Sequence, residues 1–232
     1  MANTGCVIYR GIDRPPQKLI DAFRGIPVAN IDDCMNRIAA ISSEIKPVGP
    51  SGLCGPALTV KVAEGDNRML HKALDLARPG DVIVVDAGGC MHRSIMGGLM
   101  ARYAMLRGLG GIVIDGCIRD YDELRSLSIP IYARGITPNG PYKNGPGEIN
   151  TPIVCGGRPV FPGDLVVGDS DGVLFLRRSE TEKILRDVQA LMRKEADIVR
   201  VQDQTGIYDR PWVDEKLSQL GAEILDVWTP GP

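Results

Sequence analysis

The sequence predicts an α/β domain built on a mixed sheet, and three observations support this class. Short apolar runs end in carboxylates and small residues, as at 80–90 and 111–120, which is typical of buried strands. Amphipathic segments of helical length alternate with these runs. Near the end of the chain, strand-like segments follow one another closely, so antiparallel hairpins should accompany the parallel strands.

The first part of the chain predicts two short helices, a strand and a third helix. Pro16 favours a helix over 16–24 that Gly25 ends, and two aspartates in its first turn support a helix over 31–40. Prolines and glycines break residues 47–58 into a loop. A strand is then expected over 57–62 and a helix over 70–76.

The rest of the chain predicts a regular alternation followed by short strands. A strand and tight turn are expected over 80–90, then a helix over 95–107, a strand from 111, and a helix over 122–127. A loop rich in glycine, proline and asparagine spans 136–151. The later strands are expected at 129–134, 153–155, 164–168 and 172–176.

The helix expected over 95–107 carries two signals. Its apolar residues are spaced by four and three and would share one face: Ile95, Leu99, Tyr103 and Leu106. Gly97 and Gly98 fall in its first turn, although glycine weakens a helix by about 1 kcal/mol relative to alanine. The glycines indicate either an anion bound by free amides or close packing with another element.

Arg119 and Asp120 follow the strand that begins at Gly111, at the end where open α/β sheets bind ligands. Gly116 would allow the chain to turn there. A carboxylate can hold a hard divalent cation while a guanidinium binds a substrate carboxylate in a fork, which suits keto acids. The alternative is a surface ion pair that caps the helix over 122–127.

Ser179 and Glu182 form a capping-box pattern that predicts a long helix. The apolar stripe of this helix consists of Ile184, Val188, Leu191 and Ile198. Glu195 stands at the skipped position of the stripe. Because an unpaired carboxylate on a buried face is unfavourable, we expect Glu195 to face solvent, to form an ordinary salt bridge, or to reach a polar site on a neighbour.

The composition disfavours several classes of protein. With 27 basic and 29 acidic residues and a formal charge of −2, no basic surface for nucleic acid is expected. The six cysteines show no Cys-x-x-Cys spacing, so we expect them to be reduced and mostly buried. Without a signal-peptide pattern or a run of about eighteen apolar residues, we expect a cytoplasmic protein with no membrane partner.

Other kinds of catalytic site are disfavoured as well. His71 and His92 are the two histidines, and neither has a Cys or His at zinc-site spacing. Ser94 lacks the Gly-x-Ser-x-Gly setting of a hydrolase nucleophile. Lys61 and Lys72 do not stand in a recognisable Schiff-base site, and solvated lysine is the usual case.

Several runs, taken together, resemble the class II pyruvate aldolases. They are Glu64-Gly-Asp-Asn67, Leu70-His71, Pro79-Gly-Asp-Val82, Asp86-Ala-Gly-Gly89 and the segment from Gly111 to Asp120. The resemblance covers residues 20–200. This family acts on 4-hydroxy-4-methyl-2-oxoglutarate and 4-carboxy-4-hydroxy-2-oxoadipate, and it also contains the regulator of ribonuclease activity A. The resemblance implies a layered α/β/β/α sandwich of the swivelling β/β/α type, assembled as a homotrimer or homohexamer with sites at subunit interfaces.

The resemblance also implies roles for particular residues. Asp120 resembles the single protein ligand of Mg²⁺ or Mn²⁺, and Arg119 resembles the residue that contacts the pyruvyl oxygens. Glu195 resembles a glutamate that reaches from an adjacent subunit to the water around the metal. The stretch whose amides would bind the substrate carboxylate is Gly97, Gly98, Leu99 and Met100. One position departs from the family pattern, because Gly98 stands where the family has a carboxylate, with twenty residues between it and the Arg-Asp pair.

The implied function is that of a divalent-metal-dependent lyase. It would cleave a 4-hydroxy-2-keto dicarboxylic acid to pyruvate, with oxaloacetate decarboxylation as a side activity. The alternative is a non-catalytic regulator resembling the inhibitor of ribonuclease activity, which Gly98 favours and the Arg119-Asp120 pair opposes. In either case the expected organisation is an aldolase-like domain over 1–204 and an appendage over 205–232 that packs on the body or on a neighbouring subunit.

Overall fold

The computed structural model describes residues 3–228 and divides the chain into two compact units, Met1–Gln189 and Ala190–Pro232. Helix α6 (Thr181–Thr205) crosses this boundary, and α7 (Pro211–Gln219) lies in the second unit. The boundary therefore falls inside α6, upstream of the division expected after residue 204. Whether residues 205–232 pack on the body or on a neighbouring subunit stays a prediction.

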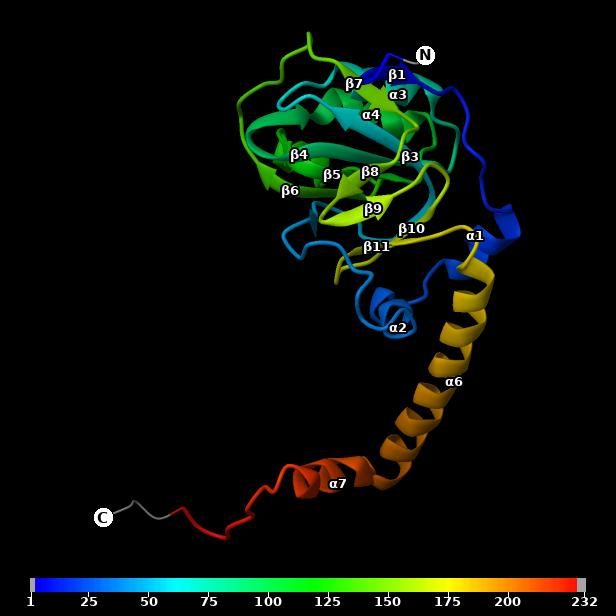
Figure 1. Ribbon diagram of the computed structural model, residues 1–232, viewed down its shortest axis with the longest axis vertical. Helices are drawn as coiled ribbons and strands as arrows, with labels where there is room; N and C mark the ends of the chain where they lie inside the picture. The colour runs from blue at the N-terminus through cyan, green and yellow to red at the C-terminus, as the bar shows by residue number, and fades with distance from the viewer. Residues whose placement is uncertain (1–2, 229–232) are drawn as a thin grey trace. The chain divides into compact units, whose positions relative to one another are not determined.

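The first unit is built around a mixed sheet, which has nine strands within the described residues. Its parallel centre consists of β3 (Leu53–Val62), β4 (Val82–Met96), β5 (Gly111–Ile118) and β6 (Ile131–Ile136), in this order (Figure 1). The antiparallel hairpin β10 (Leu165–Gly168) and β11 (Val173–Leu176) pairs with the first half of β3. Beyond β3 and β6 lie the short strands β7 (Gly147–Ile149), β1 (Cys6–Ile8) and β2 (Lys46–Pro47). Parallel and antiparallel pairing thus coexist, which confirms the predicted fold class.

Both faces of the central sheet are buried. Successive strand residues point to opposite sides of the sheet, and on β4 they belong to two different apolar clusters. On β4, Ile83 and Val85 belong to one apolar cluster, whereas Val82 and Val84 belong to the other. The first cluster is covered by α3 (Arg68–Leu76) and α4 (Gly98–Leu106). The second is covered by β11 and by a separate hairpin of β8 (Ile153–Cys155) and β9 (Arg158–Val160), which Figure 1 shows in front of the sheet. Helices therefore cover one face and strands the other.

The first half of β3 corrects the loop expected over 47–58. The strand begins at Leu53, and its residues 53–56 pair with β10, a contact between segments more than a hundred residues apart. Gly55 is required inside this strand, because a Cβ there would lie 2.2 Å from the carbonyl oxygen of Gly80. Gly55, one of the residues that indicated a loop, therefore allows a close approach of two backbones.

Other element boundaries also differ from the expected ones. β4 continues to Met96 instead of turning near residue 90, and its register is irregular at Gly88 and Gly89, whose φ values are +64° and +69°. The helix expected over 31–40 ends early, since α2 spans Val28–Asp33 and two residues with positive φ follow it. The remaining helices of this unit, α1 (Gln17–Phe23) and α5 (Tyr121–Leu124), lie close to the expected positions.

Two expectations drawn from the composition concern the cysteines and the helices. Four of the six cysteines are buried, as expected: Cys54, Cys90, Cys117 and Cys155. Between residues 3 and 228, the structure contains no helix with the length and apolar character needed to cross a bilayer.

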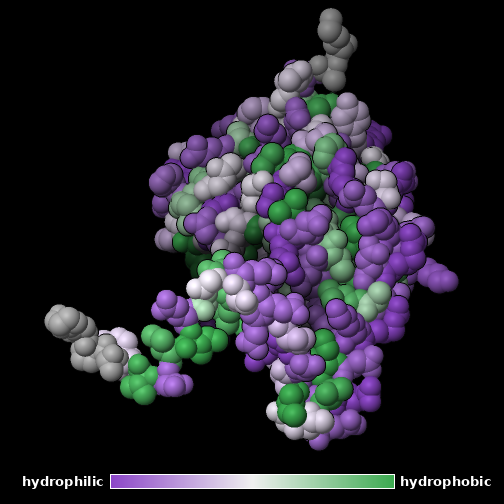
Figure 2. Space-filling model, turned by 60° about the horizontal axis from the view of Figure 1, so that its bottom comes forward, coloured by the Kyte–Doolittle hydropathy of each residue, from purple (hydrophilic) through white to green (hydrophobic). Residues whose placement is uncertain are grey.

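The second unit exposes many of its large apolar side chains. They include Trp212 on α7 and Ile224, Leu225 and Trp228 beyond it, all more than half exposed. Figure 2 shows apolar atoms gathered on the segment that leads to the grey terminal residues. Large apolar surfaces of this kind are typical of segments that bind a partner.

The close approach at Gly55 yields a test of the fold. We expect Gly55→Ala to lower the free energy of unfolding by about 1–3 kcal/mol, because its methyl group has no room against the Gly80 carbonyl. Gly52→Ala is the matched control, since a Cβ at Gly52 meets nothing within 4 Å. Urea denaturation of both variants measures the difference, and equal midpoints would contradict the packing described for β3.

Candidate active site

A cavity of about 320 Å³ lies where the carboxyl ends of β4 and β5 meet. The two strands end in register, with Met96 opposite Ile118, so the segments that follow them emerge side by side. Gly97 opens α4 on one of these segments, and Arg119 and Asp120 follow β5 on the other. The loop after β6 adds Gly140, Pro141 and Lys143, and α3 adds the remaining wall.

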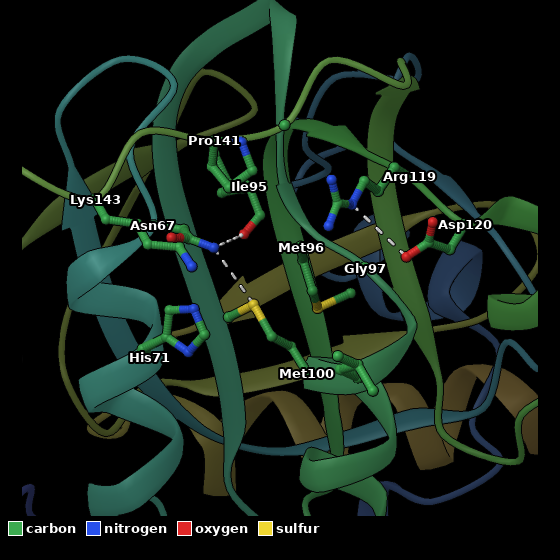
Figure 3. A pocket seen from close by; sticks show the side chains of 12 residues that line it. Asn67, His71, Ile95, Met96, Gly97, Met100, Arg119, Asp120, Pro141 and Lys143 are labelled. Atoms are coloured by element: carbon green, nitrogen blue, oxygen red, sulfur yellow. Dashed lines mark hydrogen bonds and ion pairs between the residues drawn. The ribbon is translucent and has the colours of Figure 1, made fainter.

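Arg119 and Asp120 lie together at one end of the cavity, half exposed to solvent. Their side chains approach each other with Nε of Arg119 3.7 Å from Oδ2 of Asp120 (Figure 3). Asp120 has left-handed backbone dihedrals of +59° and +40°, a conformation that is strained in most residues and concentrates at functional sites. Its carbonyl oxygen accepts hydrogen bonds from the amides of Glu123 and Leu124, which hold the strained turn in place.

The two glycines at the start of α4 allow this pair to approach the helix. The amide of Gly98 donates to Oδ2 of Asp120 at 3.0 Å. A Cβ at Gly97 would lie 2.3 Å from the same oxygen and 3.2 Å from Nε of Arg119, so a side chain there would displace both. Free amides at a helix start favour negative charge. The structure therefore brings Gly97, Gly98, Arg119 and Asp120 together. Close packing with another element is confirmed as a reason for the glycines, whereas binding of a substrate anion by these amides stays a prediction.

Asn67, His71 and Lys143 lie on the opposite side of the cavity from Arg119 and Asp120 (Figure 3). The Asn67 side chain is buried, and its Nδ2 donates to the carbonyl oxygen of Ile95 at 3.1 Å. Its Oδ1 is also buried and has no hydrogen-bond partner among the described residues. A buried oxygen of this kind requires a donor, which a bound ligand or a water can supply.

The electrostatics of the cavity favour an anionic ligand. Lys143 and Arg119 bring positive charge to its two sides, whereas Asp120 is the acidic residue that lines it. Desolvation lowers the pKa of His71 below its usual value of 6.5, and the neighbouring Lys143 ammonium lowers it further. His71 is therefore neutral at pH 7 and can offer a hydrogen bond without adding a third positive charge.

The apolar side chains expected to share a buried face of the helix are mostly exposed. Leu99 is 87% exposed, Leu106 is 81% exposed and Tyr103 is 40% exposed, whereas Ile95 belongs to β4 and is buried. The buried face of α4 consists instead of Met100, Ala101 and Ala104. The spacing identified a real stripe, but in the single chain that stripe faces solvent, with Leu99 at the edge of the cavity.

Glu195 lies on α6 in the second unit, whereas Arg119 and Asp120 belong to the first. Of the stripe expected on this helix, Ile184 and Val188 are buried, but Glu195 itself is exposed. The unfavourable burial inferred from the sequence therefore does not arise in the single chain. A role for Glu195 in the site of a neighbouring subunit stays a prediction.

The donor set of the cavity suits a hard divalent cation that the protein holds by one ligand. Among residues 3–228, no group of three or more His, Cys, Asp or Glu side chains could enclose a metal. Of the described residues that line the cavity, Asp120 is the one with a carboxylate. Mg²⁺ and Mn²⁺ commonly bind through one or two carboxylates and keep several waters, so Asp120 fits such a site with water and substrate as the other ligands.

Sequence reasoning missed two residues of the site. Asn67 closes the Glu64-Gly-Asp-Asn67 run, which was noted for its resemblance and not for its chemistry. Lys143 stands in the loop 136–151, where no periodicity marks it. Its position depends on Arg68, whose Nε donates to the Lys143 carbonyl at 2.8 Å.

Comparison with known proteins shows what this chain is similar to. A family model described as RraA-like, Aldolase/RraA, matches residues 19–175. A Halalkalibacterium halodurans protein, provisionally named 4-hydroxy-4-methyl-2-oxoglutarate aldolase, is 44% identical over 179 residues, covering 77% of this chain and 84% of that protein. The 4-hydroxy-4-methyl-2-oxoglutarate aldolase of Thermus thermophilus is 37% identical over 128 residues, covering 55% of this chain and 77% of that protein.

A solved structure shares the fold. It is that of Streptomyces coelicolor RraAS2, described as an unusual member of the RNase ES inhibitor RraA protein family. The two chains are 28% identical with a TM-score of 0.71, and the match covers 82% of this chain and all of the other.

The electrostatic interaction between His71 and Lys143 can be tested in solution. We expect the His71 pKa, followed by NMR of its imidazole protons, to lie below 6.5 and to rise in Lys143→Met, because the variant removes the ammonium that opposes protonation. Lys72→Met, at an exposed lysine next to His71 that does not line the cavity, is the control. An unchanged His71 pKa in Lys143→Met would show that the two side chains do not interact.

Proposed function

The chain belongs to the RraA-like family, and from this premise we propose that it is a divalent-metal-dependent lyase that cleaves a 4-hydroxy-2-keto dicarboxylic acid to pyruvate. One observation carries the proposal: Arg119, Asp120 and the start of α4 converge at one end of a cavity whose other side presents Lys143. The names of the aldolase relatives agree with it.

The cavity supports a substrate with an anionic group at each end. Arg119 and the backbone amides of Gly97, Leu99 and Met100 would bind the oxygens of the pyruvyl part, because a guanidinium and a helix start suit carboxylates. The amide of Gly98, which the sequence placed in the same group, already donates to Asp120. Lys143 would then pair with the second carboxylate. The unpaired Oδ1 of Asn67 would accept the hydrogen bond of the substrate hydroxyl, which supports a 4-hydroxy acid over a plain keto acid.

Asp120 would hold the Mg²⁺ or Mn²⁺ ion, with the help of water and substrate oxygens. When bound, such an ion supplies a Lewis acid next to the keto oxygen of the substrate. The 3.0 Å hydrogen bond from the Gly98 amide keeps the Asp120 carboxylate oriented toward the cavity without neutralising it.

The residues of the chain would act on charge and on protons as the C3–C4 bond breaks. The electron pair of that bond moves toward the keto oxygen, where the Arg119 guanidinium stabilises the developing negative charge. The 4-hydroxyl group loses its proton and becomes the carbonyl of the second product, while C3 gains a proton to give pyruvate. Glu195 of an adjacent subunit would hold the water that moves this proton. Loss of carbon dioxide from oxaloacetate leaves the same charge on the same oxygen, which makes decarboxylation a natural side activity.

The exposed stripe of α4 supports a homo-oligomer. Leu99 and Leu106 are more than 80% exposed, and Leu99 also borders the cavity, so a neighbour that covered this stripe would reach the site. A homotrimer or homohexamer with sites at the subunit interfaces would bury this apolar surface.

A second candidate is a non-catalytic regulator. Gly98, which lacks the carboxylate of the family pattern, favours it, as does the fold shared with RraAS2, which is described as an unusual member of an RNase inhibitor family. Pyruvate release from 4-hydroxy-4-methyl-2-oxoglutarate in the presence of Mg²⁺, followed by coupled reduction to lactate, separates the two candidates. No release at any metal concentration would favour the regulator.

Substitution of Asp120 tests the metal assignment. We expect Asp120→Asn to fold, because asparagine also tolerates left-handed dihedrals and keeps an acceptor for the Gly98 amide. Turnover should fall by on the order of 100-fold and Mn²⁺ affinity should fall with it, since the ligand charge is lost. Asp122→Asn, at a carboxylate 97% exposed, is the control. Normal Mn²⁺ affinity in Asp120→Asn would refute the assignment.

The shared site can be tested with mixed oligomers. Asp120→Ala and Glu195→Ala subunits should each be inactive alone, and we expect their mixture to recover part of the activity, because some interfaces would pair an intact Asp120 with an intact Glu195. Pyruvate release measures recovery, and sedimentation before and after mixing confirms the assembly. A monomer, or a mixture that exchanges subunits without recovery, would exclude a site shared in this way.

A further inference from the structure

The loop between β6 and β7 forms one edge of the cavity and joins its two positively charged sides. It places Gly140, Pro141 and Lys143 in the wall. Figure 3 shows the loop passing from Lys143, by way of Pro141, toward Arg119. A Cβ on Gly140 would lie 3.1 Å from Nη1 of Arg119, so the backbone of the loop passes close to the guanidinium. The position of this loop therefore sets the separation between the Lys143 ammonium and the Arg119 guanidinium.

Backbone hydrogen bonds fix this loop at two points, Asn139 and Tyr142. The Asn139 carbonyl accepts from an amide of β4, and Tyr142 exchanges hydrogen bonds with the segment before α3. The two residues between these points, Gly140 and Pro141, line the cavity. Among residues 3–228, the hydrogen bond that the structure shows for this pair comes from a side chain, since Nη1 of Arg93 donates to the Gly140 carbonyl at 2.8 Å.

Arg93 lies on β4 and is itself held by close contacts. Its guanidinium carbon lies 3.9 Å from the centroid of the Tyr142 ring, and its Nη2 donates to the Tyr142 hydroxyl at 2.6 Å. The methylene chain passes beside Gly65, where a Cβ would lie 2.8 Å from Cδ of Arg93. Because a guanidinium is planar, it can stack on a ring and donate to two acceptors at once, which a lysine cannot do.

The run from Glu64 to Asn67, noted in the sequence, is used by the same arrangement. Gly65 leaves room for Arg93, and its φ of +68° also favours glycine. The buried Asp66 accepts a hydrogen bond from the amide of Gly145 at 2.7 Å, which fixes the far end of the loop. Asn67 then lines the cavity. The run therefore builds the support of the loop and one wall of the cavity together.

We propose that Arg93 is a positioning residue that determines specificity, because by holding Gly140 it fixes Lys143 relative to Arg119 and so selects a dicarboxylate of matching length. This inference rests on the proposed function, in which Arg119 and Lys143 bind the two carboxylates. Arg93 is not among the residues that line the cavity, so it acts through the loop. Two charges held at a fixed separation favour a ligand that matches them, because little ordering is left for the moment of binding.

Two ligands of equal length test this role. 2-Oxoglutarate has a carboxylate where 2-oxopentanoate has a methyl group, and calorimetric titration of both in the presence of Mg²⁺ measures the preference without turnover. We expect the unsubstituted protein to prefer 2-oxoglutarate. Arg93→Met should lower this preference by about tenfold, because Lys143 no longer stays aligned with the second carboxylate. The affinity for 2-oxopentanoate should stay nearly unchanged.

Three further variants separate positioning from stability. Tyr142→Phe removes the hydroxyl acceptor but keeps the ring and the backbone hydrogen bonds, so it should fold and lower the preference by about threefold. Arg93→Lys keeps the charge but should resemble Arg93→Met. Arg177→Met is the matched control, since Arg177 stacks on Phe161 and donates to Asp164 away from the cavity. It should lower stability and leave the preference unchanged.

The imidazole of His71 gives a second readout that needs no ligand. The Lys143 ammonium lowers the pKa of His71, so release of the loop in Arg93→Met should raise this pKa, in the same direction as Lys143→Met does. NMR of the imidazole protons follows the change. A loss of stability alone would leave the pKa where it is, as we expect for Arg177→Met.

Two results would overturn the proposal. If Arg93→Met keeps the preference for 2-oxoglutarate, or if its affinities for both ligands fall by the same factor, Arg93 supports the fold and does not set the separation of charges. If Arg93→Met does not fold, an unchanged preference in Tyr142→Phe has the same meaning. An unsubstituted protein without any preference would instead contradict the two-anion cavity of the proposed function, and the role of Arg93 with it. Pyruvate release tests the lyase reaction separately.

Discussion

The hydrogen bond from the Gly98 amide to the Asp120 carboxylate joins the two segments on which the site depends. It forms because β4 and β5 end in register, with Met96 opposite Ile118, so that the start of α4 and the turn after β5 emerge together. It also requires the absence of a Cβ at Gly97, which would lie 2.3 Å from the accepting oxygen. The glycines, the left-handed turn at Asp120 and the parallel pairing of two distant strands are therefore parts of one arrangement.

The strained turn at Asp120 is stabilised by hydrogen bonds and packing at the start of α5. A left-handed non-glycine residue is unfavourable by about 1–3 kcal/mol. Two amide hydrogen bonds at the start of α5 and the buried Leu124 on that helix offset part of this strain. An ion pair between Glu123 of α5 and Arg102 of α4 also links the two helices. The acidic groups at the site therefore also help to hold it together.

The sequence predicted the parts of the fold that depend on local patterns. The strands around 82–85 and 111–118 and the Arg119-Asp120 pair at a strand end are present. The helix expected over 95–107 is also present, but it begins at Gly98 because β4 continues to Met96. Sequence reasoning failed where pairing between distant segments decides the outcome. Gly55 and Pro56 were assigned to a loop because a strand so rich in turn residues forms only beside a partner such as β10, and Lys143 joins the site through a loop contact with Arg68.

The apolar stripe of α4 shows why periodicity alone cannot separate a core from an interface. Leu99 and Leu106 have the spacing of a buried face, yet small residues such as Ala101 and Ala104 pack against the sheet and leave the large ones exposed. Ala101 and Ala104 belong to the apolar cluster on this side of the sheet, and the first turn of α4 lies within hydrogen-bond reach of Asp120. This orientation of α4 leaves the leucines on an outer surface, with Leu99 beside the cavity. If a second subunit covers that surface, as we expect, its binding would also exclude water from the site, so assembly and substrate binding would stabilise one another.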